Sequence, residues 1–213
     1  MKLKALVAMM AVSLVAVGAA QATISASYGW EDGVGTILGK YGNVANEANV
    51  GDKAYTGSRS LYMEETPLSG TPQAYVAFIT GLTDGDIIDA SFYAWDDTPS
   101  ASPSARIWAH YAQSSDVDSY AGSASGPSTY SAGTGWDLLS AQWTFDSDGN
   151  TRDALVIEYR LYSGSTPDPT PYWCDDVWVQ VTNNDNAMIH FAPEPASLAL
   201  LAIGGLAAIR RRR

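Results

Sequence analysis

Short runs of β-branched and aromatic residues fill the chain from residue 24 to residue 181, and this pattern limits the fold most strongly. Clusters of Gly, Pro, Ser and Asp separate the runs, and no stretch keeps the apolar period of a long helix. We therefore expect an all-β body. The expected strands are Ile24–Trp30, Arg59–Met63, Gln73–Ile79, Ile87–Trp95, Ala105–Ala112, Leu138–Phe145, Leu155–Tyr162 and Cys174–Val181.

The segments between these strands include tight turns as well as long loops. Asp146–Asn150 has a Gly in the tight position, which predicts a hairpin between the sixth and seventh strands. Ser114–Gly135 and Ser163–Pro171 are long enough to be surface loops. This mixture of connections favours a two-sheet β-sandwich of the jelly-roll type over an up-and-down barrel.

Three of the expected strands have a second face on which aromatic rings alternate with charged side chains. An antiparallel sheet normally leaves one face to water, so polar residues are expected there, whereas large exposed rings usually mark a binding surface. Rings beside hydrogen-bonding groups suit a sugar, which has an apolar C–H face and a rim of hydroxyls. Alternatively, a loop or the neighbouring sheet covers these rings as ordinary core. The candidate polysaccharide-binding residues are Tyr93, Trp95, Arg106, Trp108, His110, Glu158 and Arg160.

The first 22 residues have the composition of a secretory signal peptide. Lys2 and Lys4 precede an apolar segment, and Ala20-Gln21-Ala22 matches an A-x-A cleavage site. The sequence therefore predicts an exported protein whose body begins near Thr23.

The last 21 residues contain a Pro-Glu-Pro triplet, an apolar run and a basic end, in that order. The prolines end any preceding strand. As a helix, the run Ala196–Ile209 would be roughly 21 Å long against a hydrocarbon core of ~30 Å, so we expect it to cross a membrane with local thinning or arginine snorkelling. The basic end predicts a cytoplasmic C-terminus. The residues of the triplet and the basic end are Pro193, Glu194, Pro195, Arg210, Arg211, Arg212 and Arg213.

This tail closely resembles the PEP-CTERM sorting signal of bacteria that export matrix polymers. The resemblance implies an exosortase as the processing enzyme, a transient stay in the inner membrane, and a final place at the cell surface or in the extracellular matrix. An ordinary tail anchor is the alternative. We expect a signal peptide at residues 1–22, a sandwich domain at 23–182, a polar linker at 183–192 and the sorting signal at 193–213.

The exported body is strongly acidic. With six basic and 22 acidic residues between the two targeting segments, it carries a net charge of −16 and is expected to repel nucleic acid. The chain has no nucleophile elbow, zinc-protease motif or phosphate-binding glycine loop. A carboxylate pair such as Asp89 with Glu158 is an enzymatic alternative, but we expect no enzyme. Cys174 is the only cysteine, so no disulfide forms within the chain.

Four short segments of the body resemble the framework of jelly-roll carbohydrate-binding modules. They are Gly29-Trp30-Glu31-Asp32-Gly33, Tyr55-Thr56-Gly57-Ser58-Arg59-Ser60-Leu61, Gly135-Trp136 and Cys174-Asp175-Asp176-Val177-Trp178-Val179. The resemblance implies a structural calcium ion held by Glu31 and Asp175. Strand alternation places Asp175 on the core face with Val177, where a carboxylate needs a cation or a hydrogen-bonding partner. The alternative is that backbone donors or Arg59 satisfy it.

Together these observations predict a non-catalytic surface or matrix protein whose sandwich binds extracellular polysaccharide. Two other classes stay open at this point. One is a purely structural component of a surface layer, and the other is a secreted glycan-active enzyme.

Overall fold

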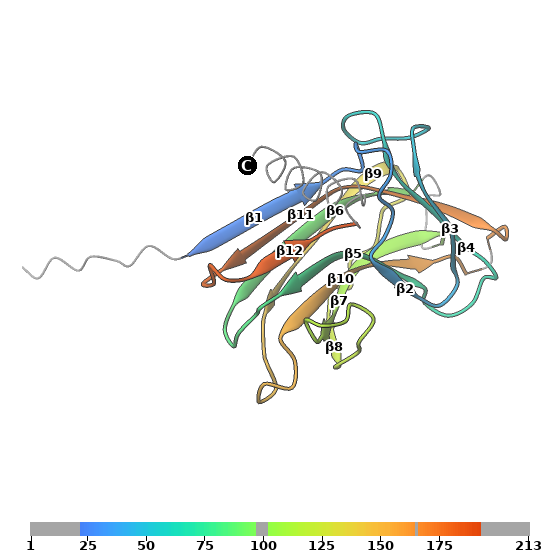
Figure 1. Ribbon diagram of the computed structural model, residues 1–213. Coiled ribbons are helices and arrows are strands. Elements are labelled where there is room, and N and C mark those ends of the chain that lie inside the picture. The colour runs from blue at the N-terminus through green and yellow to red at the C-terminus, as the bar shows by residue number, and fades with distance from the viewer. Residues whose placement is uncertain (1–21, 97–101, 165, 193–213) are drawn as a thin grey trace, which may run out of the picture.

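The computed structural model describes residues 22–96, 102–164 and 166–192, which form two packed antiparallel sheets (Figure 1). Within these ranges there is no helix long and apolar enough to cross a membrane. The expected signal peptide, apart from its last residue, and the whole expected sorting signal with its helix at 196–209 lie outside the described residues.

The first layer, called sheet A, has six strands in the order β3-β4-β11-β6-β9, and β1 extends it by pairing with β11. The long strand β11 pairs with β4 through its first half and with β1 through its second half. The strand bounds are β1 Thr23–Tyr28, β3 Val44–Val50, β4 Ser60–Glu65, β6 Ile87–Asp96, β9 Gly135–Thr144 and β11 Thr170–Thr182.

The second layer, sheet B, also has six strands, in the order β12-β5-β10-β7-β8, and β2 pairs with β5 beside β12. Its centre is β10, which pairs with β5 on one side and with β7 along its whole length on the other. The strand bounds are β2 Gly39–Tyr41, β5 Gln73–Thr80, β7 Ser104–Ala112, β8 Ser123–Ser125, β10 Ala154–Tyr162 and β12 Met188–His190.

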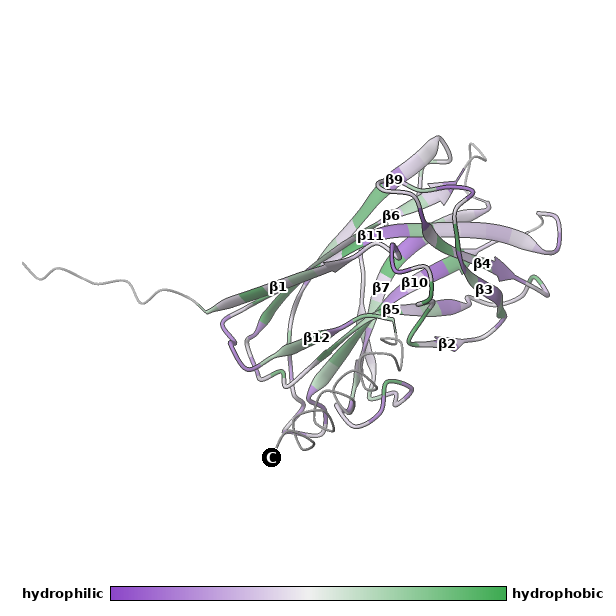
Figure 2. Cartoon of the chain, turned by 45° about the horizontal axis from the view of Figure 1, so that its top comes forward, coloured by the Kyte–Doolittle hydropathy of each residue, from purple (hydrophilic) through white to green (hydrophobic). Residues whose placement is uncertain are grey.

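The hydrophobic core lies between the two sheets. Phe92 of sheet A and Tyr159 of sheet B are fully buried and meet edge to face, with ring centroids 5.1 Å apart. Figure 2 shows hydrophobic stretches along strands such as β5 and β9, and hydrophilic residues in many of the loops between strands. The expected two-sheet β-sandwich is therefore confirmed.

Each of the eight expected strands overlaps a strand of the structure, while four short or polar strands were not expected. These are β2, β3, β8 and β12. The segment Val44–Val50 is rich in Ala, Asn and Glu, which have low strand propensity, and its pairing with β4 is what makes it a strand. Such strands depend on tertiary pairing, so local sequence does not reveal them.

The hairpin expected at Asp146–Asn150 is wrong, although the turn itself forms. The N–H of Thr151 donates to the carbonyl of Ser147 at 3.0 Å, and Gly149 has a φ of 69°. The strands on either side do not pair, because β9 belongs to sheet A and β10 to sheet B. The turn therefore links the two layers.

The structure differs from the linker expected at residues 183–192. The strand β12 pairs with β5, and the buried side chain of Asn184 donates to the carbonyl of Gly81 at 2.9 Å and to Asp86 at 2.7 Å. The asparagine-rich stretch therefore forms a turn that returns the chain to sheet B. The Pro-Glu-Pro triplet begins three residues after β12.

Candidate functional site

Antiparallel register aligns two rows of side chains on the outer face of sheet B. Because paired residues on neighbouring strands point to the same face, each row crosses four strands. The arginine row is Tyr41, Gln73, Arg160 and Arg106 on β2, β5, β10 and β7. The tryptophan row beside it is Gly39, Tyr75, Glu158 and Trp108 on the same strands. Three strand spacings make each row about 14 Å long.

A β-bulge helps to set these rows. The register between β10 and β5 shifts at Ile157/Glu158, so Ile157 pairs with Ala77 while Glu158 pairs with Tyr75. The extra residue on β5 re-aims the following side chains, as bulges commonly do near functional sites. The bulge therefore brings the Tyr75 ring beside the Glu158 carboxylate.

Glu158 is 1% exposed and is held by three neighbours. Its carboxylate accepts a hydrogen bond from Arg160 Nε at 2.7 Å and contacts His110 Nδ1 at 2.6 Å. With the Gln73 amide oriented to satisfy both of its ends, Gln73 donates to Glu158 at 3.3 Å and accepts from Arg160 at 3.1 Å. A buried carboxylate bound in this way fixes the position of the Arg160 guanidinium.

Trp108 is partly exposed, and two guanidinium groups lie close to its ring. The central carbons of Arg106 and Arg160 are 4.2 Å and 4.4 Å from its ring centroid, and its Nε1 donates to Ser123 at 3.0 Å. Cation–π contacts of this kind hold both arginines against the ring. The neighbouring Gly126 admits no side chain, because a Cβ there would lie 2.5 Å from the carbonyl oxygen of Ile107.

Exposed tyrosines surround the two rows. Tyr41 is 64% exposed at the β2 end of the arginine row, and Tyr130 is 42% exposed near Arg106 at the β7 end. Tyr120 is also exposed and lies 5.7 Å from the His110 ring. Rings and hydrogen-bonding groups therefore share one open face.

His110 has one ring nitrogen that the network leaves unused. Its Nδ1 contacts Glu158, but its buried Nε2 has no hydrogen-bond partner among the described residues. The Tyr75 ring packs edge-on against it at 5.1 Å. The imidazole is therefore enclosed by Glu158 and Tyr75 and acts within the network beneath the surface.

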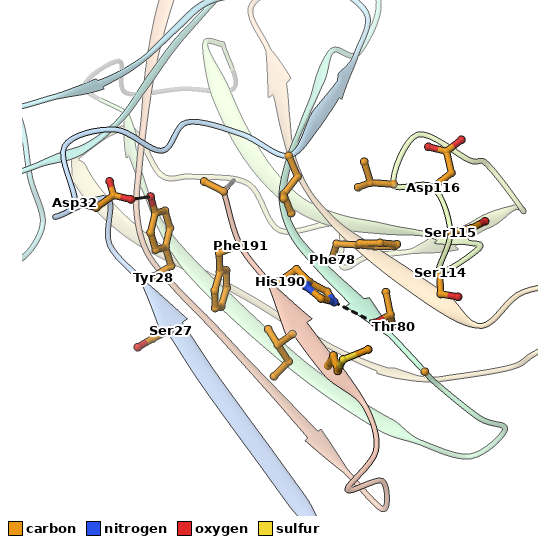
Figure 3. Close-up of a pocket in the computed structure, with 16 residues that line it drawn as sticks. Ser27, Tyr28, Asp32, Phe78, Thr80, Ser114, Ser115, Asp116, His190 and Phe191 are labelled. Carbon is orange, nitrogen blue, oxygen red and sulfur yellow. Dashed lines mark hydrogen bonds between the residues drawn. The ribbon is translucent and has the colours of Figure 1, made fainter. Parts of the chain in front are cut away.

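A groove of about 1060 Å³ lies at the other end of sheet B, beside β12 (Figure 3). Tyr28 stacks on Phe191 at 5.8 Å, and His190 contacts the Thr80 hydroxyl at 3.1 Å and tilts against Phe78. The groove wall is mainly apolar, and the described chain ends within it at residue 192. Polar groups of residues such as Ser114 and Asp116 also line it, but its mainly apolar wall suits a hydroxyl-rich polymer less well.

Five of the seven expected polysaccharide-binding residues lie together on this face of sheet B. The other two, Tyr93 and Trp95, do not, because β6 belongs to sheet A. Trp95 pairs in register with Trp136 and Trp173, and Lys53 lies over this ladder, 4.0 Å from the Trp173 ring centroid. Alternation correctly placed Tyr93 and Trp95 on the outer face of β6, but it does not reveal which sheet this strand joins.

Five residues of the face were not expected from the sequence. Gln73 and Tyr75 alternate on an expected strand, so the same reasoning would have found them. Tyr41 lies on an unexpected strand, and Tyr120 and Tyr130 lie in loops that only tertiary contacts bring to His110 and Arg106.

The loop between β3 and β4, residues 51–59, covers part of the outer face of sheet A. Glu31 accepts from the backbone N–H groups of Ser58 and Arg59 at 2.9 Å and 2.8 Å. Asp175 accepts from the N–H groups of Tyr55 and Thr56 at 2.7 Å and 3.3 Å. The two carboxylates therefore hold different parts of one loop.

The expectation that Asp175 points into the core is wrong. A register shift between Asp175 and Trp178, with Asp176 at a φ of 48°, breaks the alternation of β11. Val177 faces the core, whereas Asp175 pairs with Tyr93 and lies on the outer side beneath the loop. It is fully buried, but by the loop and not by the other sheet.

Calcium binding by Glu31 and Asp175 stays a prediction. Both carboxylates already accept hydrogen bonds from the loop, which is the alternative that the sequence left open. Residues 22–96, 102–164 and 166–192 contain no group of three or more His, Cys, Asp or Glu side chains placed to hold a metal ion. In this structure each carboxylate holds the loop by hydrogen bonds.

The carboxylates considered for glycosidase chemistry, Asp89 and Glu158, do not face each other. Asp89 lies on the outer face of sheet A, where Gln142 donates to it at 2.7 Å, and Glu158 lies on the outer face of sheet B. The two layers of the sandwich separate them, so they do not flank a common substrate.

The comparisons with known proteins agree with the two resemblances found in the sequence. Residues 192–213 match the PEP-CTERM protein-sorting motif, which marks the chain as an exported protein. A search of curated proteins finds no match.

Several solved structures share the β-sandwich. The CBM22-1 xylan-binding domain from Paenibacillus barcinonensis superposes with a TM-score of 0.50 at 16% identity, covering 76% of this chain and 97% of that one. The CBM22-1–CBM22-2 tandem domain from the same organism gives 0.53 at 17% identity, covering 84% and 50%. Another xylan-binding domain of CBM 22 gives 0.50 at 17% identity, covering 75% and 95%. The fold is therefore that of carbohydrate-binding β-sandwich modules.

The burial of Asp175 has a measurable consequence for stability. Burial raises the pKa of Asp175 from 3.8 to about 6, so the folded chain takes up a proton that the unfolded chain takes up only at lower pH. We predict that the unfolding free energy of the wild type, relative to Asp175→Asn, increases by about 2 kcal/mol as the pH falls from 7.5 to 4.5. Urea denaturation of both proteins at each pH measures it.

Repeating the urea denaturation in EGTA and in excess CaCl₂ tests whether calcium binds at Asp175. A calcium ion on Asp175 would lower its pKa and flatten the profile in calcium only. A flat profile in both media would contradict the raised pKa of the buried Asp175 carboxylate.

Proposed function

We propose that this chain is a non-catalytic polysaccharide-binding protein that acts at the cell surface or in the extracellular matrix. The observation that carries the proposal is the partly exposed arginine row, which crosses β2, β5, β10 and β7 on the outer face of sheet B. The sorting motif supports the location, since it implies export and processing by an exosortase-type enzyme. The solved xylan-binding domains of similar fold support the ligand class.

The chemistry of the face suits a polymer of sugars. Exposed rings at both ends of the arginine row offer apolar surfaces for C–H groups, and the amide and guanidinium groups between them donate to hydroxyls. A row about 14 Å long accommodates several linked sugar units and leaves both ends open. An open row therefore fits the interior of a long chain better than a single free sugar.

The environment of Glu158 supports binding over catalysis. Its two oxygens contact His110 and Arg160, and only 1% of the residue is exposed. A general acid of a glycosidase must reach the glycosidic oxygen and needs a second carboxylate across the cleft. Glu158 instead acts as the anchor that orients Arg160.

The aromatic residues of sheet A favour a structural role. Tyr55 of the covering loop stacks on Tyr93 at 3.5 Å, and Lys53 of the same loop lies over Trp95 and Trp173. These contacts tie the loop to the sheet. Tyr41 on β2 and Tyr130 in a loop are also exposed, but they lie at the ends of the hydrogen-bonding arginine row, which favours a ligand-binding face there.

We predict that Trp108→Ala weakens polysaccharide binding at least about tenfold, which corresponds to about 1.4 kcal/mol. The change removes the ring on which both arginines are stacked. Trp178→Ala is the matched control, because Trp178 is also an exposed tryptophan, at 37%, but lies on sheet A. Affinity electrophoresis of the mature body against the exopolysaccharides of the producing cell measures the effect.

Circular dichroism and thermal melting establish that both variants fold. Equal affinity of Trp108→Ala and wild type, or an equal loss in Trp178→Ala, would show that the outer face of sheet B is not the binding surface.

A further prediction concerns processing. We expect the mature protein to begin near Thr23 and to end near Pro193–Pro195, because the match to the PEP-CTERM motif implies processing by an exosortase. Intact mass spectrometry of the protein from its native cell measures both ends. Recovery of chain that still contains Arg213, held in the inner membrane, would contradict the processing step.

A further inference from the structure

We propose that the outer face of sheet B binds an acidic polysaccharide, whose sugar units carry carboxylates, and that Arg106 pairs with the sugar carboxylate. This inference rests on the proposed function and names the ligand class of the same face. It starts from a guanidinium group whose contacts are all neutral.

Arg106 is hydrogen-bonded, yet its charge has no counterpart among the described residues. Its Nε donates to the carbonyl of Pro127 at 2.7 Å, and its Nη atoms donate to Tyr130 Oη at 3.3 Å and to the carbonyl of Gly126 at 3.4 Å. No ion pair within the described ranges includes Arg106. Three of the five N–H donors of this guanidinium are used, which leaves two for a ligand.

The charges around Arg106 strengthen this point. Arg160, its partner in the arginine row, is already paired with Glu158 at 2.7 Å, and Glu158 also contacts His110. The two arginines and one carboxylate give this part of the face one uncompensated positive charge. Of the six basic residues of the exported body, Lys40, Arg152 and Arg160 form ion pairs within the described ranges, and Arg106 is one of the three that do not.

The β2 end of the outer face of sheet B carries a negative charge. A Cβ on Gly39 would lie 2.5 Å from Asp118 Oδ1, so the Asp118 carboxylate lies against β2. Burial is the main cause that raises the pKa of Tyr75 to about 12, and the nearby carboxylates of Glu158 and Asp118 raise it further. The face is therefore positive over β7 and negative over β2. This polarity predicts that the sugar carboxylate lies over β7 and that sugar hydroxyls lie over β2.

The arginine is also held in place before a ligand arrives. Arg106 lies 4.2 Å from the Trp108 ring centroid and 5.4 Å from the Tyr130 ring centroid, between the strand and the loop that follows it. A fixed guanidinium loses little freedom on pairing with a carboxylate, and such a charge-assisted pair is stronger than a hydrogen bond to a neutral hydroxyl.

The overall charge of −16 does not rule out an acidic ligand. At physiological ionic strength the Debye length is about 8 Å, so the acidic residues on the far side of the sandwich are largely screened from this face. The direct contact at Arg106 then determines which polymer is preferred.

The test uses polygalacturonate and its methyl ester, which have the same backbone and differ in whether the carboxylates are charged. Both are titrated into the mature wild-type body by calorimetry at 0.15 M NaCl. We expect the free acid to bind at least about tenfold more tightly than the ester, the effect of one charge-assisted pair. Alginate and its ester, compared in the same way, provide a second uronate backbone.

Variants locate the preference on the face. Arg106→Gln is expected to bring the affinity for the free acid to that for the ester. Lys40→Gln is the matched control, because it removes the same charge from sheet B but from an ammonium that is paired with Glu47 at 2.6 Å. It is expected to keep the preference. The wild-type comparison of acid and ester needs no variant, so the test holds even if Arg106→Gln folds poorly.

Equal affinity for acid and ester, or binding to neither form of either polymer, would overturn the acidic-ligand inference. A preference lost equally in Lys40→Gln would also overturn it. Binding to the esters or to neutral glycans with no preference for the acids would leave the proposed function in place. A failure to bind any polysaccharide of the producing cell would contradict the proposed function itself.

Discussion

The pairing of β10 with β5 and β7 at once is the constraint on which the candidate site depends. Each register is fixed by the core face, since a shift of one residue would turn Ile157 and Tyr159 out of the core and Glu158 into it. Because the register is set by burial of the core face, it also determines which side chains lie next to each other on the outer face. Gln73, Glu158, Arg160 and Trp108 meet because the hydrophobic residues behind them are packed, and a single bulge on β5 adjusts where Tyr75 lies.

Electrostatics explains why an acidic protein can present such a face. Where a carboxylate is buried here, it is bound by donors: Glu158 by Arg160 and His110, and Asp175 by the N–H groups of Tyr55 and Thr56. These contacts stabilise the buried carboxylates, which would otherwise destabilise the fold, and fix the positions of the groups that bind them. Arg106 on the outer face of sheet B is instead held by neutral acceptors, so its charge is available to a partner.

Local sequence patterns predicted the strands well and their assembly only in part. Alternation in Ala105–Ala112 and Leu155–Tyr162 placed five site residues on one face, because burial of every second residue is a local property. Whether β6 joins the same sheet is decided by pairing with β11 and β9 across the chain, so Tyr93 and Trp95 were assigned to the wrong surface. Asp175 was misplaced for another reason: the bulge at Asp176 has no signature in alternation.

The most direct test of the binding face is a nuclear magnetic resonance titration of the ¹⁵N-labelled mature body with oligosaccharides from the producing cell's matrix. Backbone amides report where a ligand lies without any substitution. The account predicts shifts that gather on β2, β5, β7 and β10, strongest near Trp108 and Arg160, with β6, β9 and β11 unchanged. Shifts confined to sheet A, around Trp95 and Trp178, would contradict it.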